Sequence, residues 1–102
     1  MRIGFDSEEL QKVFNRREKL EAAYGPRLAR SIRIRMAVLR SANHLGLVPQ
    51  LPPIGLAVID PRSLTFSVDL VEKRALLFRS SSSLSSDLEL SYIREISILA
   101  VQ

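Results

Sequence analysis

A proline-rich segment in the middle of the chain limits the folds that the sequence can adopt. Pro49, Pro52 and Pro53 fall within five residues, in the stretch LVPQLPPIG. Proline lacks the backbone N–H that helices and central strands need, and it pushes the preceding residue toward an extended conformation. We therefore expect an extended connector here, with a differently patterned half on each side of it.

The half before the connector has the apolar spacing of two helices. Asp6 followed by Glu9 is typical of a capping box that opens the first helix. Gly25-Pro26 ends that helix and begins the second, because proline is favoured at the first helical position, and Gly46 is expected as the C-terminal cap. The short connection predicts an antiparallel helical hairpin. The expected buried stripe of the second helix is Leu28, Ile32, Met36 and Leu39.

The half after the connector has the alternation of strands. LAVI, from Leu56, predicts a short strand, and DPRS predicts a turn with proline at its second position. Apolar and polar residues alternate over residues 64–70, a turn follows at Glu72-Lys73, and residues 75–78 form an apolar run. Residues 92–101 alternate again, whereas RSSSSLSSDLE predicts a polar loop. Helices followed by strands predict one α+β domain over residues 1–102, with a two-helix hairpin packed on an antiparallel sheet of about four strands.

Charge is distributed unevenly along the chain. Residues 1–45 hold ten Lys and Arg against five Asp and Glu, a net charge of +5, whereas residues 46–102 have a net charge of −1. A basic half of this kind favours a polyanionic or acidic partner. Two solvated, arginine-rich helices are the alternative. No apolar run is long enough to span a membrane, and there is no cysteine, so we expect a cytoplasmic protein.

Familiar site chemistry is sparse in this sequence. There is no glycine-rich phosphate loop. The single histidine, His44, argues against a metal cluster and is better explained by a capping role or an interaction with the helix dipole at a helix end. We expect no cofactor and no metal. Arg30, Arg33 and Arg40 fall within an arc of about 80° beside the buried stripe. They predict either a phosphate-facing patch or a solvated helix face.

A second basic row lies on the first expected helix. Lys12 and Arg16, together with Lys19, recur at helical spacing on a face away from its apolar residues. We group Lys12 and Arg16 with the candidate nucleic-acid contacts. Ile34 and Val38 lie off the main stripe of the second helix. They predict either packing against the first helix or the connector, or an apolar patch that receives a partner or a second copy.

Two longer stretches carry a family resemblance. AAYGPRLARSIRIRMAVLRSANHL resembles the two-helix half, and LTFSVDLVEKRALLF the central hairpin, of the HigB-like branch of the RelE/ParE toxin superfamily. IREISILAV resembles the last strand of that branch. The resemblance implies two N-terminal helices on a curved antiparallel sheet. It also implies a toxin of a type II toxin–antitoxin pair, silenced by a cognate antitoxin that is often a helix-turn-helix protein.

The resemblance also assigns candidate site residues. HigB- and RelE-like toxins cleave mRNA in the ribosomal A site, which requires positive charge at the pentavalent phosphate and acid–base groups for the two oxygens. Arg74 matches the sheet arginine of the family, which stabilises phosphate charge, and Arg62 lies in a turn that is normally basic. A set made of Arg62, Lys73, Arg74 and Glu95 is the candidate catalytic group.

Several family positions differ in this sequence. The region that usually reads like HxLKG is LAVIDPRS here, Lys73 stands where Tyr or Trp usually precedes the arginine, and the chain ends at ILAVQ without a Tyr-His tail. Three explanations therefore stand side by side. The chain is a ribosome-dependent endonuclease that uses the residual set, a ParE-like protein that acts without nuclease chemistry, or a degenerate toxin that only binds its antitoxin.

Overall fold

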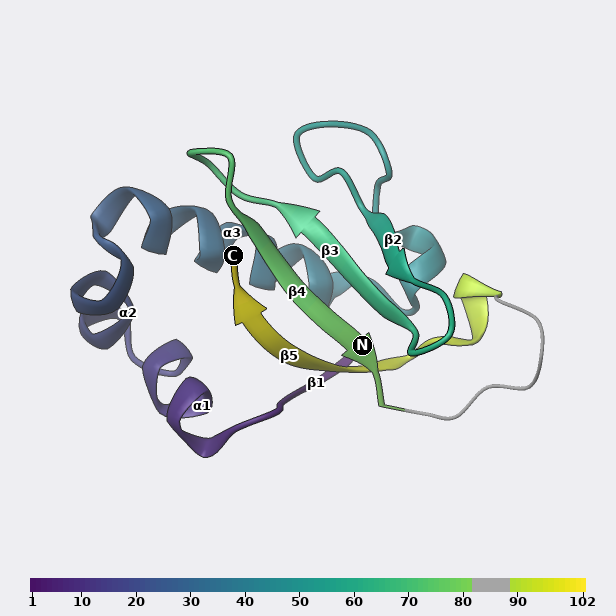
Figure 1. Cartoon of the computed structure of the whole chain (residues 1–102), viewed down its shortest axis with the longest axis horizontal. Helices are drawn as coiled ribbons and strands as arrows, with labels where there is room; N and C mark the ends of the chain where they lie inside the picture. The colour runs from purple at the N-terminus through teal and green to yellow at the C-terminus, as the bar shows by residue number, and fades with distance from the viewer. Residues whose placement is uncertain (82–88) are drawn as a thin grey trace.

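The computed structural model describes residues 1–81 and 89–102 and has an α+β fold. The chain order is β1 (Arg2–Phe5), α1 (Glu8–Phe14), α2 (Arg17–Tyr24), α3 (Pro26–Ser41), β2 (Ala57–Asp60), β3 (Thr65–Asp69), β4 (Ala75–Ser80) and β5 (Glu95–Val101). Two short 3-10 helices, η1 (Leu45–Leu47) and η2 (Leu90–Tyr92), follow α3 and precede β5. The α-helices and the sheet form two layers, and α3 passes behind the strands in Figure 1.

The sheet has five strands in the order β1-β5-β4-β3-β2, and it is mixed. Strands β2 to β5 pair antiparallel, as predicted, but β1 pairs parallel to β5, with Ile3 opposite Ile96. The prediction of about four antiparallel strands was therefore wrong by one strand. β1 contributes only two inward apolar residues, Ile3 and Phe5, and its partner strand lies more than ninety positions away in the chain. Alternation of apolar and polar residues over only four positions is too weak a sequence signal to predict such a strand.

A bulge in the sheet changes which side chains of β5 face the core. Phe78 pairs with Ile98, but Leu77 pairs with Ala100, so one extra residue of β5 is inserted between these pairs. The even alternation predicted for Ile96, Ile98 and Ala100 therefore ends at Ile98. Ala100 shares the outer face with Leu77, and Val101 takes the inward position opposite Leu76 and packs against the core.

The expected first helix is divided into α1 and α2. Asn15 ends α1, and Arg16 is extended, with φ −128°. The break allows Phe14 to pack edge-on against both Phe5 and Tyr24, with ring centroids 5.5 and 6.4 Å apart. Packing of this aromatic cluster offsets the helical hydrogen bonds that a continuous helix would gain across the break.

The caps of the helices also differ from the sequence prediction. Ser7 is the N-cap of α1, and its Oγ accepts a hydrogen bond from the N–H of Leu10 at 3.1 Å. Asp6, predicted as the cap, instead forms an ion pair with Arg79 of β4 at 2.9 Å. The junction at Gly25-Pro26 is confirmed, because α2 ends at Tyr24 and α3 begins at Pro26. Gly46 does not cap α3, which ends at Ser41, and it lies in η1 instead.

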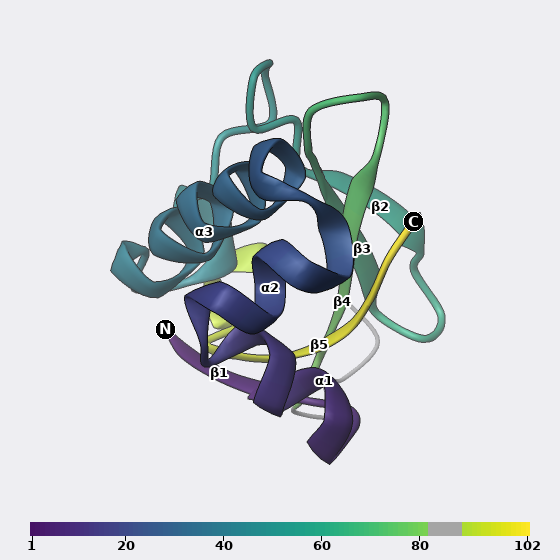
Figure 2. The same cartoon turned by 90° about the vertical axis from the view of Figure 1, so that its left-hand side faces the viewer.

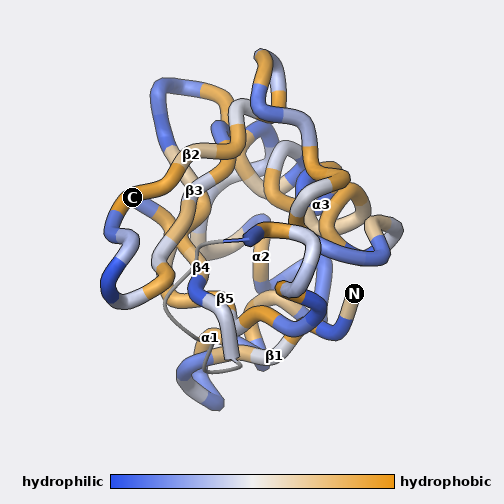
Figure 3. Tube along the Cα trace, turned by 90° about the vertical axis from the view of Figure 1, so that its right-hand side faces the viewer, coloured by the Kyte–Doolittle hydropathy of each residue, from blue (hydrophilic) through white to orange (hydrophobic). Residues whose placement is uncertain are grey.

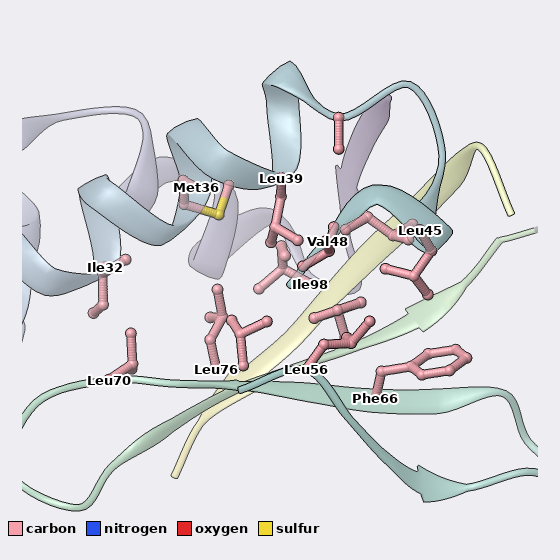
Figure 4. Packing of buried hydrophobic residues seen from close by; sticks show 14 of the residues in the cluster. Ile32, Met36, Leu39, Leu45, Val48, Leu56, Phe66, Leu70, Leu76 and Ile98 are labelled. Atoms are coloured by element: carbon pink, nitrogen blue, oxygen red, sulfur yellow. The ribbon is translucent and has the colours of Figure 1, made fainter. Parts of the chain in front are cut away.

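The core lies between α3 and the inner face of the sheet. Figure 4 shows Ile32, Met36 and Leu39 on the side of α3 that faces Leu70 and Leu76. The predicted stripe of α3 is confirmed, since its four residues are at most 3% exposed. Phe66 and Phe78 stack across β3 and β4 with centroids 5.9 Å apart. Burying side chains of this size stabilises the fold by about 1.5–3 kcal/mol each.

The connector forms a closed loop and does not run straight. The N–H of Leu56 donates to the carbonyl of Pro49 at 3.0 Å, and the N–H of Asp69 donates to the carbonyl of Ile54 at 2.7 Å. The loop is thereby attached to the end of β3. In the hydropathy colouring of Figure 3, the edge strand β2 that follows the loop is hydrophobic. Its residues Val58 and Ile59 are about half exposed, at 46% and 55%.

The predicted turn between β3 and β4 is confirmed. Glu72 and Lys73 have φ values of +63° and +57°, and the N–H of Arg74 donates to the carbonyl of Val71 at 3.2 Å. Two successive residues in the left-handed region define a type I′ turn, whose twist matches that of the two strands. The buried hydroxyl of Ser31 on α3 accepts a hydrogen bond from the N–H of Val71 at 3.1 Å and fixes the base of this hairpin to the helix. The predicted polar loop lies mostly in residues 82–88, outside the described residues.

Candidate nucleic-acid interface

Helix α3 is the most basic element of the fold. Its sixteen residues include five arginines and no acidic residue. Arg35 is engaged by main-chain acceptors, because its Nε donates to the carbonyl of Asp69 at 2.6 Å and its Nη2 to that of Pro53 at 3.1 Å. Within the described ranges 1–81 and 89–102, no carboxylate forms an ion pair with the other four arginines. These are Arg27, Arg30, Arg33 and Arg40.

One flank of α3 forms a pocket with the junction between α1 and α2. We call it the helix pocket; its volume is about 350 Å³. The three helices that surround it face the viewer in Figure 2. Arginines from two helices contribute to its wall, and no acidic residue of the described part of the chain does. The lining residues are Phe14, Asn15, Arg17, Leu20, Ile32, Arg33, Met36 and Arg40.

Arg33 has an unmet hydrogen-bonding group at this pocket. Its Nε atom is covered by the protein, and no acceptor among the described residues binds it. A buried donor without a partner costs about 1–3 kcal/mol. An anion that pairs with this guanidinium removes that cost, so its binding free energy is more favourable than that of an anion at an exposed arginine. Arg17, on the opposite wall, is already paired with Glu21 at 3.0 Å. Arg33 and Arg40 are therefore the cations available at the helix pocket.

The other flank of α3 forms a second hollow of about 310 Å³ against the β3–β4 hairpin, which we call the hairpin-side pocket. It is lined by Arg27, Arg30, Ser31, Ile34, Arg35 and Val71. The predicted trio is thus divided, with Arg33 and Arg40 on one flank and Arg30 on the other. Among the residues that the structure describes, each pocket beside α3 is lined by three arginines and by no carboxylate.

The two apolar residues predicted off the main stripe have different environments. Ile34 is 46% exposed and lines the hairpin-side pocket. Val38 is half-buried and packs against the core. Val38 therefore contributes to packing of the core, whereas Ile34 remains available to a partner.

Lys12 and Arg16 lie near the break between α1 and α2. Lys12 is exposed in the last turn of α1. Arg16 forms an exposed ion pair with Glu18 at 2.7 Å. The pKa of the Glu18 carboxyl is lowered, first by a hydrogen bond from its own backbone N–H at the start of α2 and then by the Arg16 guanidinium. Because the helix breaks here, Lys12 and Arg16 do not share the single helix face predicted for them.

The candidate catalytic residues divide between the two ends of the sheet. Lys73 and Arg74 lie at the hairpin tip, where the Nε of Arg74 donates to the carbonyl of Gln102 at 2.7 Å. Arg62 follows β2, and Glu95 begins β5 beside Ser81. Arg74 and Arg79 span five residues of β4, about 16 Å at the usual strand rise, and Arg79 pairs with Thr65 at the end where Arg62 lies. The structure brings Lys73 and Arg74 together, and it does not bring Arg62 or Glu95 to them.

Arg62 lies in a turn that is organised by the preceding residue. The Oδ1 of Asp60 accepts a hydrogen bond from the N–H of Arg62 at 2.9 Å. This bond is the main cause that lowers the pKa of the Asp60 carboxyl, and the Ser63 hydroxyl is the next. The DPRS segment therefore forms the predicted turn, and the Arg62 side chain is exposed to solvent.

His44 has no capping role at the end of α3. It precedes η1, makes no side-chain capping bond there, and its Nδ1 is covered without a partner in the described part of the chain. Over the same residues, no group of three or more potential metal-binding side chains occurs. No described helix combines the length and the apolar character needed to cross a membrane.

Sequence reasoning missed part of the candidate interface. Asn15 and Arg17 line the helix pocket only because α1 and α2 are separate helices. Arg27 was overlooked, although the run from Pro26 to Ser41 with five arginines and no carboxylate is visible in the sequence. The absence of carboxylates from this run was the sequence signal that could have added Arg27 to the candidate interface. No protein-family model, curated protein or solved structure matches this chain.

Proposed function

We propose that this chain is a RelE/HigB-like toxin that binds RNA through helix α3. The observation that carries the proposal is the charge of that helix, five arginines with no carboxylate, repeated in both pockets that flank it. Arginine-rich surfaces without counter-charge bind phosphate backbones with little sequence preference and with strong salt dependence. The α+β architecture and the hairpin that ends in Arg74 are compatible with the toxin resemblance.

The site geometry favours binding without cleavage over the endonuclease hypothesis. Cleavage of a phosphodiester requires acid–base groups and positive charge around one phosphate, within hydrogen-bond reach. Arg62 and Glu95 lie at the other end of the sheet from Lys73 and Arg74, and the Arg74 Nε is occupied by the Gln102 carbonyl. We therefore place the non-nucleolytic alternative first and keep ribosome-dependent cleavage as the second candidate, supported by the adjacent cations Lys73 and Arg74.

The proposed partners follow from the same assignment. Ribosomal RNA or messenger RNA is the expected polyanion. The expected inhibitor is a cognate antitoxin, which we would search for as a helix-turn-helix protein encoded beside the gene. The half-exposed Ile34 lines the hairpin-side pocket together with Arg27 and Arg30 and offers an apolar contact within a basic surface. An acidic segment of an antitoxin has the complementary charge.

Induction in a bacterial host, with growth curves and primer extension on a reporter message, tests this function. We expect growth arrest with intact message, and relief of arrest by Arg33→Gln/Arg40→Gln but not by Arg74→Ala. Arg2→Gln/Arg94→Gln is the charge-matched control, because both residues are exposed, neither belongs to α3 and neither lines a pocket beside it. Message cleavage that is abolished by Arg74→Ala would support the endonuclease instead. Normal growth on induction of the parent chain and of every variant, at equal protein levels, would refute the toxin proposal.

A further inference from the structure

The helix pocket combines an apolar floor with cations on its wall. Leu20, Ile32 and Met36 close its base and are at most 3% exposed, Phe14 adds an aromatic ring, and Asn15 contributes an amide. Its volume of about 350 Å³ lies at the lower end of the range of small-molecule sites, about 300–1,000 Å³. A pocket of this kind suits a ligand with one flat apolar part and one anionic part.

Two cations are available to the anionic part. Arg33 and Arg40 are seven residues apart, which is two helical turns, with Met36 between them on the same flank of α3. Neither forms an ion pair in the described part of the chain. The covered Nε of Arg33 also lacks an acceptor. A modest rotation of that guanidinium toward a bound anion supplies the missing partner, and charge-assisted bonds of this type are the strong ones.

The remaining groups suit the flat part of the ligand. Nucleobases stack on aromatic rings and on guanidinium planes, and they form hydrogen bonds with side-chain amides along their edges. Phe14 and the amide of Asn15 lie side by side in the chain at the break between α1 and α2. Both residues line the pocket at this break.

We propose that the helix pocket binds a single nucleoside phosphate unit, with its phosphate on Arg33 and Arg40 and its base against Phe14 and Asn15. The unit can come from a free nucleotide or from one position of an RNA strand, since both present the same chemistry. The inference rests on the proposed RNA binding and assigns a defined subsite to it.

The test uses the whole chain labelled with ¹⁵N and titrated with adenosine 5′-monophosphate, adenosine or inorganic phosphate. We expect the monophosphate to bind more tightly than either fragment and to shift the backbone amide signals of Asn15, Arg17 and Arg40. Arg40→Gln should weaken binding by about tenfold, the effect of losing one charge-assisted bond, and Phe14→Leu should reduce the affinity to that for inorganic phosphate. The exposed Arg94→Gln should change the affinity by less than about twofold.

The outcomes separate this inference from the proposed function. Equal binding of adenosine monophosphate and inorganic phosphate, or equal effects of Arg40→Gln and Arg94→Gln, would overturn the subsite even if RNA binds elsewhere on α3. An RNA hexamer that displaces the monophosphate and shifts the same amides identifies the strand as the source. Monophosphate binding at these amides without RNA binding supports the subsite for a free nucleotide and counts against the proposed function. Arg40 is exposed, so its variant is expected to fold; a dispersed spectrum verifies this.

Discussion

The Nε atom of Arg35 donates a hydrogen bond of 2.6 Å to the main-chain carbonyl of Asp69 and joins helix α3 to the end of strand β3. A second bond of 3.1 Å from the same guanidinium reaches the carbonyl of Pro53 in the connector. Arg35 thereby holds together the three segments that meet at this corner of the fold. It is the one arginine of α3 whose role is structural.

Arg35→Ala is expected to lower the free energy of unfolding by about 1–2 kcal/mol, because two charge-assisted bonds to carbonyls are lost at a partly exposed site. Urea unfolding followed by circular dichroism measures the change. Arg30→Ala is the matched control, since Arg30 lies on the same helix, is exposed and forms no ion pair with residues 1–81 or 89–102. Equal destabilisation by the two variants would show that Arg35 acts only through helix propensity or charge.

Gly55→Ala is expected to destabilise the connector for two separable reasons. Gly55 has φ +62°, and a Cβ placed there collides with the carboxylate of Asp69. The left-handed conformation alone costs an alanine about 1–2 kcal/mol. In a double-mutant cycle, Asp69→Ala should recover the part of the lost free energy of unfolding that comes from the collision. The part that comes from the left-handed conformation of residue 55 should remain. Full recovery in the double variant would refute the argument from φ.

Replacement of Glu72-Lys73 by Asn-Gly is expected to stabilise the fold by about 1–2 kcal/mol. Both residues occupy the left-handed region, with φ +63° and +57°, and Asn-Gly is the preferred pair for a type I′ turn. Thermal unfolding measures the change, and Ala-Ala at these positions controls for loss of the two side chains. A lower melting temperature for Asn-Gly than for the parent chain would contradict the turn assignment.

The Asp60 carboxyl is expected to titrate below the ordinary range for aspartate. The N–H of Arg62 donates to it, and the resulting lowered pKa means that folding favours the ionised form. Its contribution to stability is present above the pKa of the unfolded chain and is lost as the pH falls through the folded pKa. A carboxyl-detected NMR titration reports the midpoint. A midpoint at or above that of an exposed aspartate in a peptide would contradict the turn geometry.

The sequence was sufficient for those parts of the fold that depend on local pattern. Alternation around Phe66 and the run that contains Phe78 identified the central hairpin, and the 3.6-residue spacing identified the buried face of α3. β1 was missed because its stability comes from parallel pairing with β5, a contact between distant parts of the chain. The division of the first helix was missed because it depends on the contacts of Phe14 with Phe5 and Tyr24.

The candidate site shows the same limit. Arg33 and Arg40 could be grouped from helical angles alone, and they do line one pocket. Arg17 could not be assigned to the same pocket from the sequence, because the direction of its helix depends on the break at Arg16. The predicted catalytic group combined residues from turns and strand ends, and sequence proximity does not show which end of a sheet a residue occupies. Strand length and pairing place Arg62 far from Arg74.

RNA binding by α3 is the central claim, and its salt dependence is the most direct measurement of it. Fluorescence anisotropy with a labelled single-stranded RNA should give an affinity that falls steeply with salt. Each phosphate contact contributes about 0.7 to the slope of log K against log salt, so Arg33→Gln/Arg40→Gln should reduce the slope by about 1.4. Arg2→Gln/Arg94→Gln removes the same charge from residues that are outside α3 and line neither pocket, and it should leave the slope unchanged. Equal slopes for both variants, or no binding by the parent chain, would contradict the claim.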